Sequence, residues 1–285
     1  RNDAMACDPV SAAAAAAASR LFGVVGKNVL VTGGSRGIGF MIAKTFVEHG
    51  ANVLLTSRDA KACEEAASSL RCHYVASNVS SREGCRELAE NASKVFNGKL
   101  HVLINNAGTS WGEPMSRESG KANWGWDKVL DLNVKGIFYL TRECLPMLEQ
   151  TASSNSRDDP ARIINIGSVT GMVPQQAPTH AYDISKAAVH QLTRKLAGDL
   201  ASQNITVNAV APGYVPSRMS QGLATWGADA AAISSNVPLR RMGDTDDMGG
   251  ACIYFASRAG AWCTGVILNV DGGTVGAWQI PLSNL

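Results

Sequence analysis

From Lys27 onward, short apolar runs alternate with longer segments in which apolar residues recur every three or four positions. Short apolar runs bounded by turn residues predict buried strands, and the longer spacing predicts amphipathic helices. Strands are predicted at 29–31, 53–56, 73–76, 100–105, 162–166, 205–209 and 266–270. Helices are predicted at 38–49, 60–70, 82–96, 126–149, 181–200 and 246–257.

Strands that alternate with helices of ten or more residues predict βαβ units, with a parallel sheet covered on both faces. The fold class is therefore α/β, a doubly wound seven-stranded parallel sheet of the Rossmann type. No composition break or internal repeat divides residues 25–285, which are predicted to form a single domain. Residues 1–24 include an alanine run and carry no fold signal, so they are predicted to be disordered or weakly ordered.

The composition excludes several classes of function. A net charge of +2 over 285 residues gives no electrostatic reason for a nucleic-acid partner, and no apolar stretch approaches the ~18 residues of a membrane span. The seven cysteines are scattered without a Cys-x-x-Cys pair, which argues against disulfides and against a metal site. A cytoplasmic location, or an organelle with a reducing interior, follows. A targeting role for residues 5–24 stays open, although Asp8 and the single Arg20 are untypical of one.

A glycine-rich turn follows the first predicted strand and opens the first helix. Glycines let the backbone turn tightly and approach a pyrophosphate at the helix N-terminus, where free N–H groups favour an anion. The spacing here is Gly-x-x-x-Gly-x-Gly. A purely structural turn is the alternative, but a strand before and a helix after favour a dinucleotide site. The turn residues predicted to bind the cofactor are Gly33, Ser35, Arg36, Gly37, Ile38 and Gly39.

The end of the second strand indicates which dinucleotide is bound. In Rossmann sheets an acid at this position holds the ribose 2′-OH of NAD, whereas arginines accept the 2′-phosphate of NADP. This strand runs into Ser57 and Arg58, and Asp59 comes one residue later. Arg36 adds a second guanidinium on the same side, which suits a dianionic phosphate. The sequence therefore predicts NADP(H), with two solvated surface arginines as the alternative.

Tyr182 and Lys186 are spaced i, i+4 at the start of a predicted helix, so their side chains share one face. A phenol has a pKa of about 10, and a nearby ammonium is expected to lower it toward working pH. Ser168 ends an apolar run, where a strand tip would present its hydroxyl to a substrate oxygen. Tyr-x-x-x-Lys is common by chance, and an exposed Tyr and Lys on an amphipathic helix is the alternative.

These motifs follow one another along the chain in an order that is typical of a known protein family. The glycine turn, Asn106-Ala107-Gly108, Asn133, Ser168, Tyr182-x-x-x-Lys186 and Pro212-Gly213 follow one another as in short-chain dehydrogenases/reductases. The resemblance covers roughly residues 25–275. Within the family, residues 106–112 and 216–219 are most similar to 3-oxoacyl-carrier-protein reductases, especially the branch associated with rhamnolipid synthesis.

The resemblance implies roles for individual residues. Ser168 would hold the substrate carbonyl, Tyr182 would protonate it, and Lys186 would lower the pKa of Tyr182 and bind the nicotinamide ribose. Asn133 would anchor a water that links Lys186 to solvent. The remaining implied cofactor contacts are Asn78 and Val79 at the adenine, Asn106, Ala107 and Gly108 at the adenine ribose, and Pro212, Gly213 and Val215 at the nicotinamide.

The expected function is NADPH-dependent reduction of a ketone, with a small-molecule or 3-oxoacyl-thioester substrate and an acyl carrier protein as a possible partner. A free cyclic, aromatic or polyol-type ketone is the first alternative, and a non-enzymatic NADP-binding scaffold is the second. Segment 215–238, with Met219, Leu223 and Trp226, is expected to form a lid. Together with Trp111, Val169 and Met172 it would make an apolar pocket.

Assembly is predicted from helix faces and from a strand edge. The predicted helices 126–149 and 181–200 carry apolar residues beyond one stripe, and such helices usually have a second surface to bury. The final strand would be an open sheet edge. Members of the resembled family bury both the second helix surface and the strand edge by forming tetramers, so a homotetramer with dihedral symmetry is predicted. The alternative is a monomer whose tail, residues 274–285, covers this surface.

Overall fold

The computed structural model describes residues 9–118, 124–217 and 230–277. Seven parallel strands form one sheet in the order β3-β2-β1-β4-β5-β6-β7. The strands are β1 (Asn28–Thr32), β2 (Asn52–Ser57), β3 (His73–Ala76), β4 (Val102–Asn105), β5 (Ala161–Ile166), β6 (Ile205–Pro212) and β7 (Ile267–Val270). The predicted α/β, doubly wound seven-stranded sheet is confirmed.

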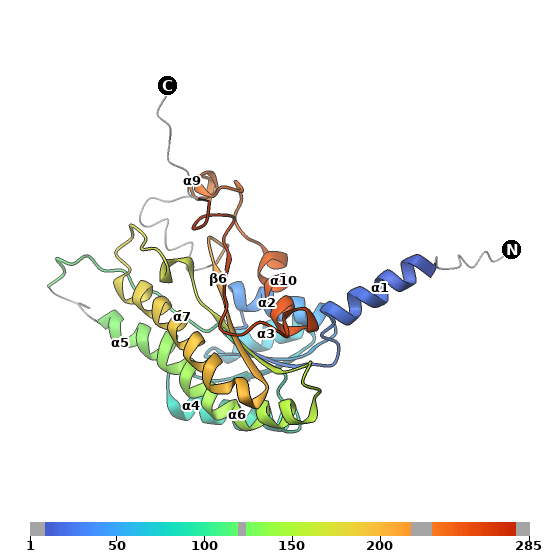
Figure 1. Cartoon of the computed structure of the whole chain (residues 1–285). Helices are drawn as coiled ribbons and strands as arrows, with labels where there is room; N and C mark the ends of the chain where they lie inside the picture. The colour runs from blue at the N-terminus through green and yellow to red at the C-terminus, as the bar shows by residue number, and fades with distance from the viewer. Residues whose placement is uncertain (1–8, 119–123, 218–229, 278–285) are drawn as a thin grey trace.

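Helices cover both faces of the sheet, and each face has its own apolar core (Figure 1). One core lies under α4, α6 and α7, with Leu88, Leu148 and Leu200 buried in it. The other lies under α2 and α10, with Phe46 and Phe255 buried in it. The helices are α2 (Gly37–Glu48), α3 (Ala60–Leu70), α4 (Arg82–Val95), α5 (Trp124–Leu130), α6 (Gly136–Ser154), α7 (His180–Leu200), α9 (Ala230–Asn236) and α10 (Thr245–Ala256), and short turns are η2 (Val169–Gly171), η3 (Ala201–Gln203) and η5 (Arg258–Gly260).

The sheet extends from β1 in two directions, with β2 and β3 on one side and β4 to β7 on the other. The order of the strands therefore reverses between β1 and β4. Val29 pairs with Val53 of β2 on one side and with Val102 of β4 on the other. All four β4 residues are buried, because a parallel strand in the middle of a doubly wound sheet is covered on both faces. Ligands of such sheets bind at the carboxyl ends of the strands beside this switch point, so the topology places the site at that edge.

The predicted helix 126–149 is divided in the structure. Helix α5 leads into the π-helical segment η1 (Asp131–Lys135), and α6 then continues to Ser154 with Pro146 inside it. A π turn contains an extra residue, and such turns frequently mark functional sites. Here Asn133 lies within the π segment and is fully buried. Apolar periodicity predicted a helix, and it did not reveal the π turn.

The N-terminal segment contains a helix that the sequence analysis did not predict. Helix α1 (Pro9–Phe22) lies within the residues that were expected to be disordered or weakly ordered. Its alanine run favours a helix, because alanine has the highest helix propensity. The helix projects from the body of the protein (Figure 1), and its side chains from residue 13 onward are exposed. The packed core begins at Val24, which is 1% exposed.

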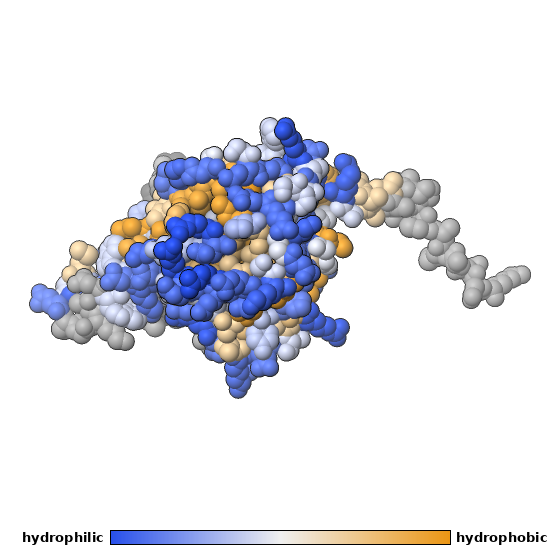
Figure 2. All heavy atoms as spheres, turned by 90° about the horizontal axis from the view of Figure 1, so that it is seen from below, coloured by the Kyte–Doolittle hydropathy of each residue, from blue (hydrophilic) through white to orange (hydrophobic). Residues whose placement is uncertain are grey.

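Polar side chains cover most of the face seen from below, and patches of apolar side chains lie between them (Figure 2). In the part of the chain that the structure describes, no helix is long and apolar enough to cross a bilayer.

Candidate active site

A cavity of about 1190 Å³ lies at the carboxyl ends of the strands. Its walls come from the segments that follow β1, β2, β3, β4, β5 and β6. The predicted site residues in its lining are Gly33, Ser35, Arg36, Gly37, Ile38, Gly39, Ser57, Arg58, Val79, Asn106, Ala107, Gly108, Ser168, Tyr182, Lys186, Pro212, Gly213 and Val215. Asn78 and Asn133 were predicted as well, but they do not line it.

The glycine turn has little room for side chains. Gly33 and Gly37 have φ angles of 67° and 56°, in the left-handed region that favours glycine. A Cβ at Gly39 would lie 2.3 Å from the carbonyl oxygen of Gly33. No side chain caps the N-terminus of α2 at Arg36, so backbone N–H groups remain for an anion.

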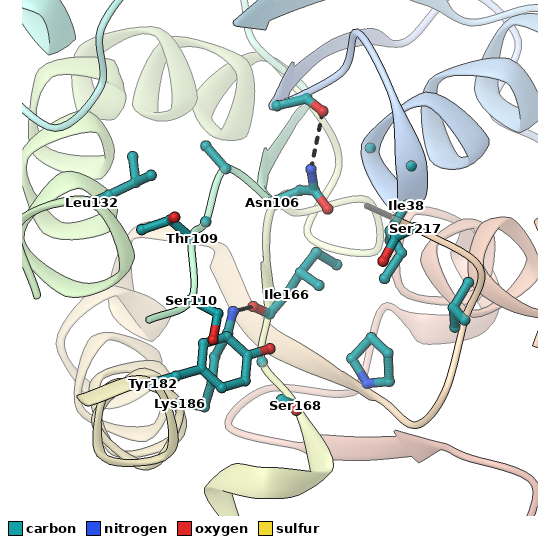
Figure 3. Close-up of a pocket in the computed structure, with 18 of the residues that line it drawn as sticks. Ile38, Asn106, Thr109, Ser110, Leu132, Ile166, Ser168, Tyr182, Lys186 and Ser217 are labelled. Carbon is teal, nitrogen blue, oxygen red and sulfur yellow. Dashed lines mark hydrogen bonds between the residues drawn. The ribbon is translucent and has the colours of Figure 1, made fainter. Parts of the chain in front are cut away.

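Thr32 joins the glycine turn to the segment after β4. Its Oγ1 accepts the backbone N–H groups of Asn106 and Ala107, both at 2.9 Å. The Asn106 side chain donates back to the Thr32 carbonyl at 2.8 Å, and Asn106 lies beside the glycine turn in Figure 3. Sequence reasoning missed Thr32, although its place at the tip of β1 was a signal.

At the end of β2, the polar groups are held in a small cluster. Ser35 Oγ donates to Ser57 Oγ at 3.0 Å, and the Ser57 backbone N–H donates to Cys63 Sγ at 3.1 Å. The Asp59 carboxylate accepts the Ala62 N–H at 3.1 Å and caps α3. Asp59 lines the cavity beside Ser57 and the exposed Arg58, but its carboxylate is used as the cap of α3.

The Asn78 side chain bonds within its own turn. Its Oδ1 accepts the Ser80 N–H at 3.3 Å and the Ser80 hydroxyl at 2.8 Å. Short amide side chains readily make such turns with their own backbone. Its neighbours Ser77 and Val79 line the cavity, whereas Asn78 does not, and the adenine contact of Asn78 stays a prediction.

Ser168, Tyr182 and Lys186 converge on one wall of the cavity, with the Tyr182 ring toward Ser168 (Figure 3). Lys186 is 6% exposed and its Nζ donates to the Ile166 carbonyl at 2.8 Å. The same Nζ lies 5.6 Å from the centroid of the Tyr182 ring. Ser168 Oγ accepts from the Thr170 N–H at 3.2 Å and from the Thr170 hydroxyl at 3.1 Å.

Burial determines the ionisation of these groups. It raises the pKa of Tyr182 to about 12, while the hydrogen bond with Ser168 acts in the opposite direction and the Asp183 charge adds to the rise. Burial also lowers the pKa of Lys186 to about 8. The sequence analysis expected Lys186 to lower the pKa of Tyr182. The net shift of the Tyr182 pKa is upward instead, because desolvation dominates, and the Lys186 ammonium donates to the Ile166 carbonyl.

Asn133 connects the segment after β4 to helix α7 from behind the cavity wall. Its Nδ2 donates to the Thr109 carbonyl and to Ser185 Oγ, and its Oδ1 accepts the Thr109 N–H, all at 2.9 Å. Ser185 Oγ in turn donates to the Tyr182 carbonyl at 2.7 Å. The buried amide therefore holds Thr109 and the turn that carries Tyr182. Sequence reasoning missed Ser185 as a partner.

His190 packs against the turn that carries Ser168. It is 3% exposed, and burial together with the Lys186 charge lowers its pKa to about 4. A Cβ at Gly167 would lie 2.3 Å from His190 Nε2. The only sequence signal for this packing was the i, i+4 spacing of His190 from Lys186.

The expected apolar pocket is present in part. Trp111 and Val169 line the cavity, whereas Met172 does not. Trp111 packs edge-on against Trp124, with ring centroids 4.9 Å apart. The lid residues Met219, Leu223 and Trp226 lie outside the described residues. Within those described, no group of three or more His, Cys, Asp or Glu is placed to hold a metal ion.

The chain matches known proteins over most of its length. A family profile described as "Enoyl-(Acyl carrier protein) reductase" matches residues 33–275. The rhamnolipids biosynthesis 3-oxoacyl-[acyl-carrier-protein] reductase of Pseudomonas aeruginosa is 43% identical over 256 residues, which is 88% of this chain and 97% of that protein. A tropinone reductase homolog of Arabidopsis thaliana is 32% identical, over 88% of this chain and 92% of that protein.

Solved structures are also similar. One described as the Pseudomonas aeruginosa RhlG/NADP active-site complex superposes with a TM-score of 0.83 at 41% identity, covering 90% of this chain and 98% of that one. Another, described as a putative gluconate dehydrogenase from Agrobacterium tumefaciens, gives a TM-score of 0.79 at 27% identity, with the same coverage of both chains.

Proposed function

Because the chain belongs to the short-chain dehydrogenase/reductase family, we propose that it is an NADPH-dependent reductase that converts a 3-oxoacyl thioester into the 3-hydroxyacyl thioester. One observation carries the proposal. Ser168, Tyr182 and Lys186 form one wall of the same cavity that contains the glycine turn and the Arg58 loop. The similarity to the Pseudomonas aeruginosa 3-oxoacyl-[acyl-carrier-protein] reductase and to the NADP complex supports the substrate class and the cofactor.

The cavity fits NADP(H), which when bound supplies hydride to a carbonyl carbon. The glycine turn, with the uncapped N-terminus of α2, would hold the pyrophosphate. Ser57, Arg58 and Arg36 would hold the 2′-phosphate, since two guanidiniums suit a dianion and the nearest carboxylate caps α3. Lys186 would contact the nicotinamide ribose.

Ser168 is oriented to donate a hydrogen bond. Its oxygen accepts both donors of Thr170, so its own proton remains for the oxygen of a bound carbonyl compound or for Tyr182. Developing negative charge on that oxygen strengthens such a bond, which makes it more effective in the transition state than in the ground state.

Tyr182 is the proposed proton donor. A pKa of about 12 keeps the phenol protonated at neutral pH, so the proton is available when a carbonyl oxygen becomes an alkoxide. Lys186, with a pKa of about 8, stands next to it as the nearest group that can exchange protons near neutrality. Asn133 is proposed to act on this pair through Thr109 and Ser185.

The substrate proposal can be tested by following NADPH absorbance with matched carbonyl compounds. We expect the highest kcat/KM with 3-oxoacyl thioesters, and a comparison of carrier-protein thioesters with coenzyme A thioesters tests whether an acyl carrier protein docks. The tropinone reductase homolog at 32% identity keeps a free cyclic ketone as the second candidate. Rapid reduction of such ketones, with no turnover of any thioester, would replace the first candidate by the second.

We also propose a homotetramer, located in the cytoplasm or in an organelle with a reducing interior. Apolar side chains are exposed on helices α6 and α7 at Phe138 and Ile184, and beside the edge strand at Trp262 and Val266. All four residues of β7 are partly exposed. The six described cysteines are free, which supports the reducing environment.

A further inference from the structure

A polar cluster outside the proposed catalytic set joins one wall of the cavity to helix α7. The Gln175 amide donates to Thr179 Oγ1 at 2.7 Å and to Asp183 Oδ1 at 3.3 Å. Thr179 Oγ1 donates to the same carboxylate oxygen at 3.1 Å. Asp183 Oδ1 therefore accepts two donors from the segment that precedes its own helix, and hydrogen bonds to a carboxylate are stronger than neutral ones.

The cluster holds the segment that would face a substrate. Val173, Pro174, Gln175 and Thr179 all line the cavity, whereas Asp183 does not. Segment 172–179 follows the turn that carries Ser168, and it ends where α7 begins. Asp183 is the residue after Tyr182 in that helix, so its carboxylate ties the wall to the turn of the proposed proton donor.

The local geometry shows that the carboxylate is used for this contact. Thr179 occupies the N-cap position of α7, but its side chain makes no capping hydrogen bond. Its hydroxyl is directed at Asp183 instead. In addition, the Glu113 N–H donates to the Pro178 carbonyl at 3.0 Å, which attaches the same segment to the residues that follow β4. The wall is thus fixed to two elements of the site.

We propose that Asp183 is a positioning residue that sets the affinity for the carbonyl substrate by holding segment 172–179 against the helix that carries Tyr182 and Lys186. The inference rests on the proposed reductase function. A wall fixed before the substrate arrives avoids the ordering cost of binding. Loss of the carboxylate should therefore raise the KM for the carbonyl substrate, while the dissociation constant for NADPH stays unchanged.

The first test compares Asp183→Ala with Asp183→Asn in the full chain. Asp183→Ala should raise the substrate KM by about tenfold, the factor that corresponds to one charge-assisted hydrogen bond, with a much smaller change in kcat. Asp183→Asn keeps an acceptor oxygen and should restore most of the affinity. Asp199→Ala is the matched control, because Asp199 lies on the same helix and pairs with the exposed Lys195. Equal KM values for Asp183→Ala and wild type would overturn the proposal.

Amide hydrogen exchange gives a readout that is independent of turnover. Exchange in segment 172–179 should be faster in Asp183→Ala than in wild type, and unchanged in Asp199→Ala. Thr179→Val removes the bridging hydroxyl with little change of shape, and it should accelerate the same amides even if Asp183→Ala does not fold. Unchanged exchange in a folded variant contradicts the positioning role. Absence of thioester reduction by the wild type instead contradicts the proposed function, and the exchange result still decides the role of Asp183.

Discussion

At the residue scale, desolvation is the main influence on Tyr182 and Lys186. Both side chains line the cavity, and burial favours the neutral form of each, which raises the pKa of the phenol and lowers that of the ammonium. The phenol is therefore held as a proton donor, while Lys186 can lose its proton near pH 8. This pairing suits reduction, which consumes a proton at the carbonyl oxygen.

Tyr182→Phe should abolish this donor without changing the shape of the cavity. We expect turnover to fall by about 10²-fold or more, the usual contribution of a positioned acid. NADPH binding, followed by fluorescence titration, should persist. A variant that kept a tenth of the wild-type rate would show that another group donates the proton.

Lys186→Met should reveal the cost of burying the ammonium. Because the pKa of Lys186 in the folded protein, about 8, lies below the ordinary lysine value of 10.5, the unfolded chain binds the proton more tightly. Below pH 8 the wild type therefore carries the full penalty, about 3 kcal/mol at most. The penalty is relieved as the pH rises from about 8 to 10.5. Urea unfolding of both proteins should show the wild type gaining stability relative to Lys186→Met across that window, and a constant difference would refute the buried-charge account.

Arg58→Glu should reverse the cofactor preference. The substitution places a carboxylate at the tip of β2, where NAD-binding sheets hold the ribose, and it removes a guanidinium that suits the 2′-phosphate. We expect the KM for NADPH to rise by about tenfold or more, and the KM for NADH to fall. Lys61→Glu, a charge reversal in helix α3, which follows Arg58, at a residue that does not line the cavity, should change neither. A wild type that prefers NADH would contradict the assignment of Arg58.

At the element scale, helices α2 and α10 approach closely at one glycine. A Cβ at Gly249 would lie 2.0 Å from Thr45 Oγ1, which is itself bonded to the Met41 carbonyl in α2. A Cβ at the next residue, Gly250, would meet nothing within 4 Å. The packing of α2 matters for the site, because its first turn contains the glycine-rich segment.

Gly249→Ala should therefore destabilise the fold by about 1–3 kcal/mol through overpacking, and it should weaken NADPH binding by displacing α2. Gly250→Ala should stabilise the protein by up to about 1 kcal/mol, since alanine is the better helix former. Urea denaturation of the two variants checks the pair. Equal effects of the two substitutions would mean that the helices separate without cost.

At the scale of the whole molecule, apolar surface remains on two sides. Trp262 is 99% exposed and Ile184 is 52% exposed, and they belong to the β7 side and to α7 respectively. Exposed apolar side chains together with an open strand edge usually indicate an interface. Two different surfaces on one chain fit dihedral assembly, in which each twofold axis buries one of them.

Light scattering at micromolar concentration should give a mass near four times 29.9 kDa. Trp262→Arg should reduce the mass to that of a dimer by breaking the interface on the β7 side, whereas the α6 and α7 surface stays intact. A single-chain mass for the wild type would rule out both interfaces. A twofold mass would leave one of them.

The sequence by itself determined the elements and most of the cavity lining. Hydrophobic periodicity is a local property, so the strand His73–Ala76 and the helix Ala60–Leu70 have the predicted bounds. The glycine turn was predictable as well, because positive φ angles and close backbone contacts restrict it to glycine. Residues at strand tips converge in any parallel sheet, which is why Ser168 and Arg58 could be assigned to one site.

Only the tertiary structure decided how the polar side chains are used. Asn78 bonds to its own turn, Asn133 bonds to Thr109 and Ser185, and Asp183 holds a cavity wall. These partners lie on the neighbouring turn or on other elements, so periodicity cannot reveal them. The direction of the Tyr182 pKa shift also required the fold. The sequence shows that an ammonium is four residues away, but the loss of water that outweighs it depends on every segment packed around the phenol.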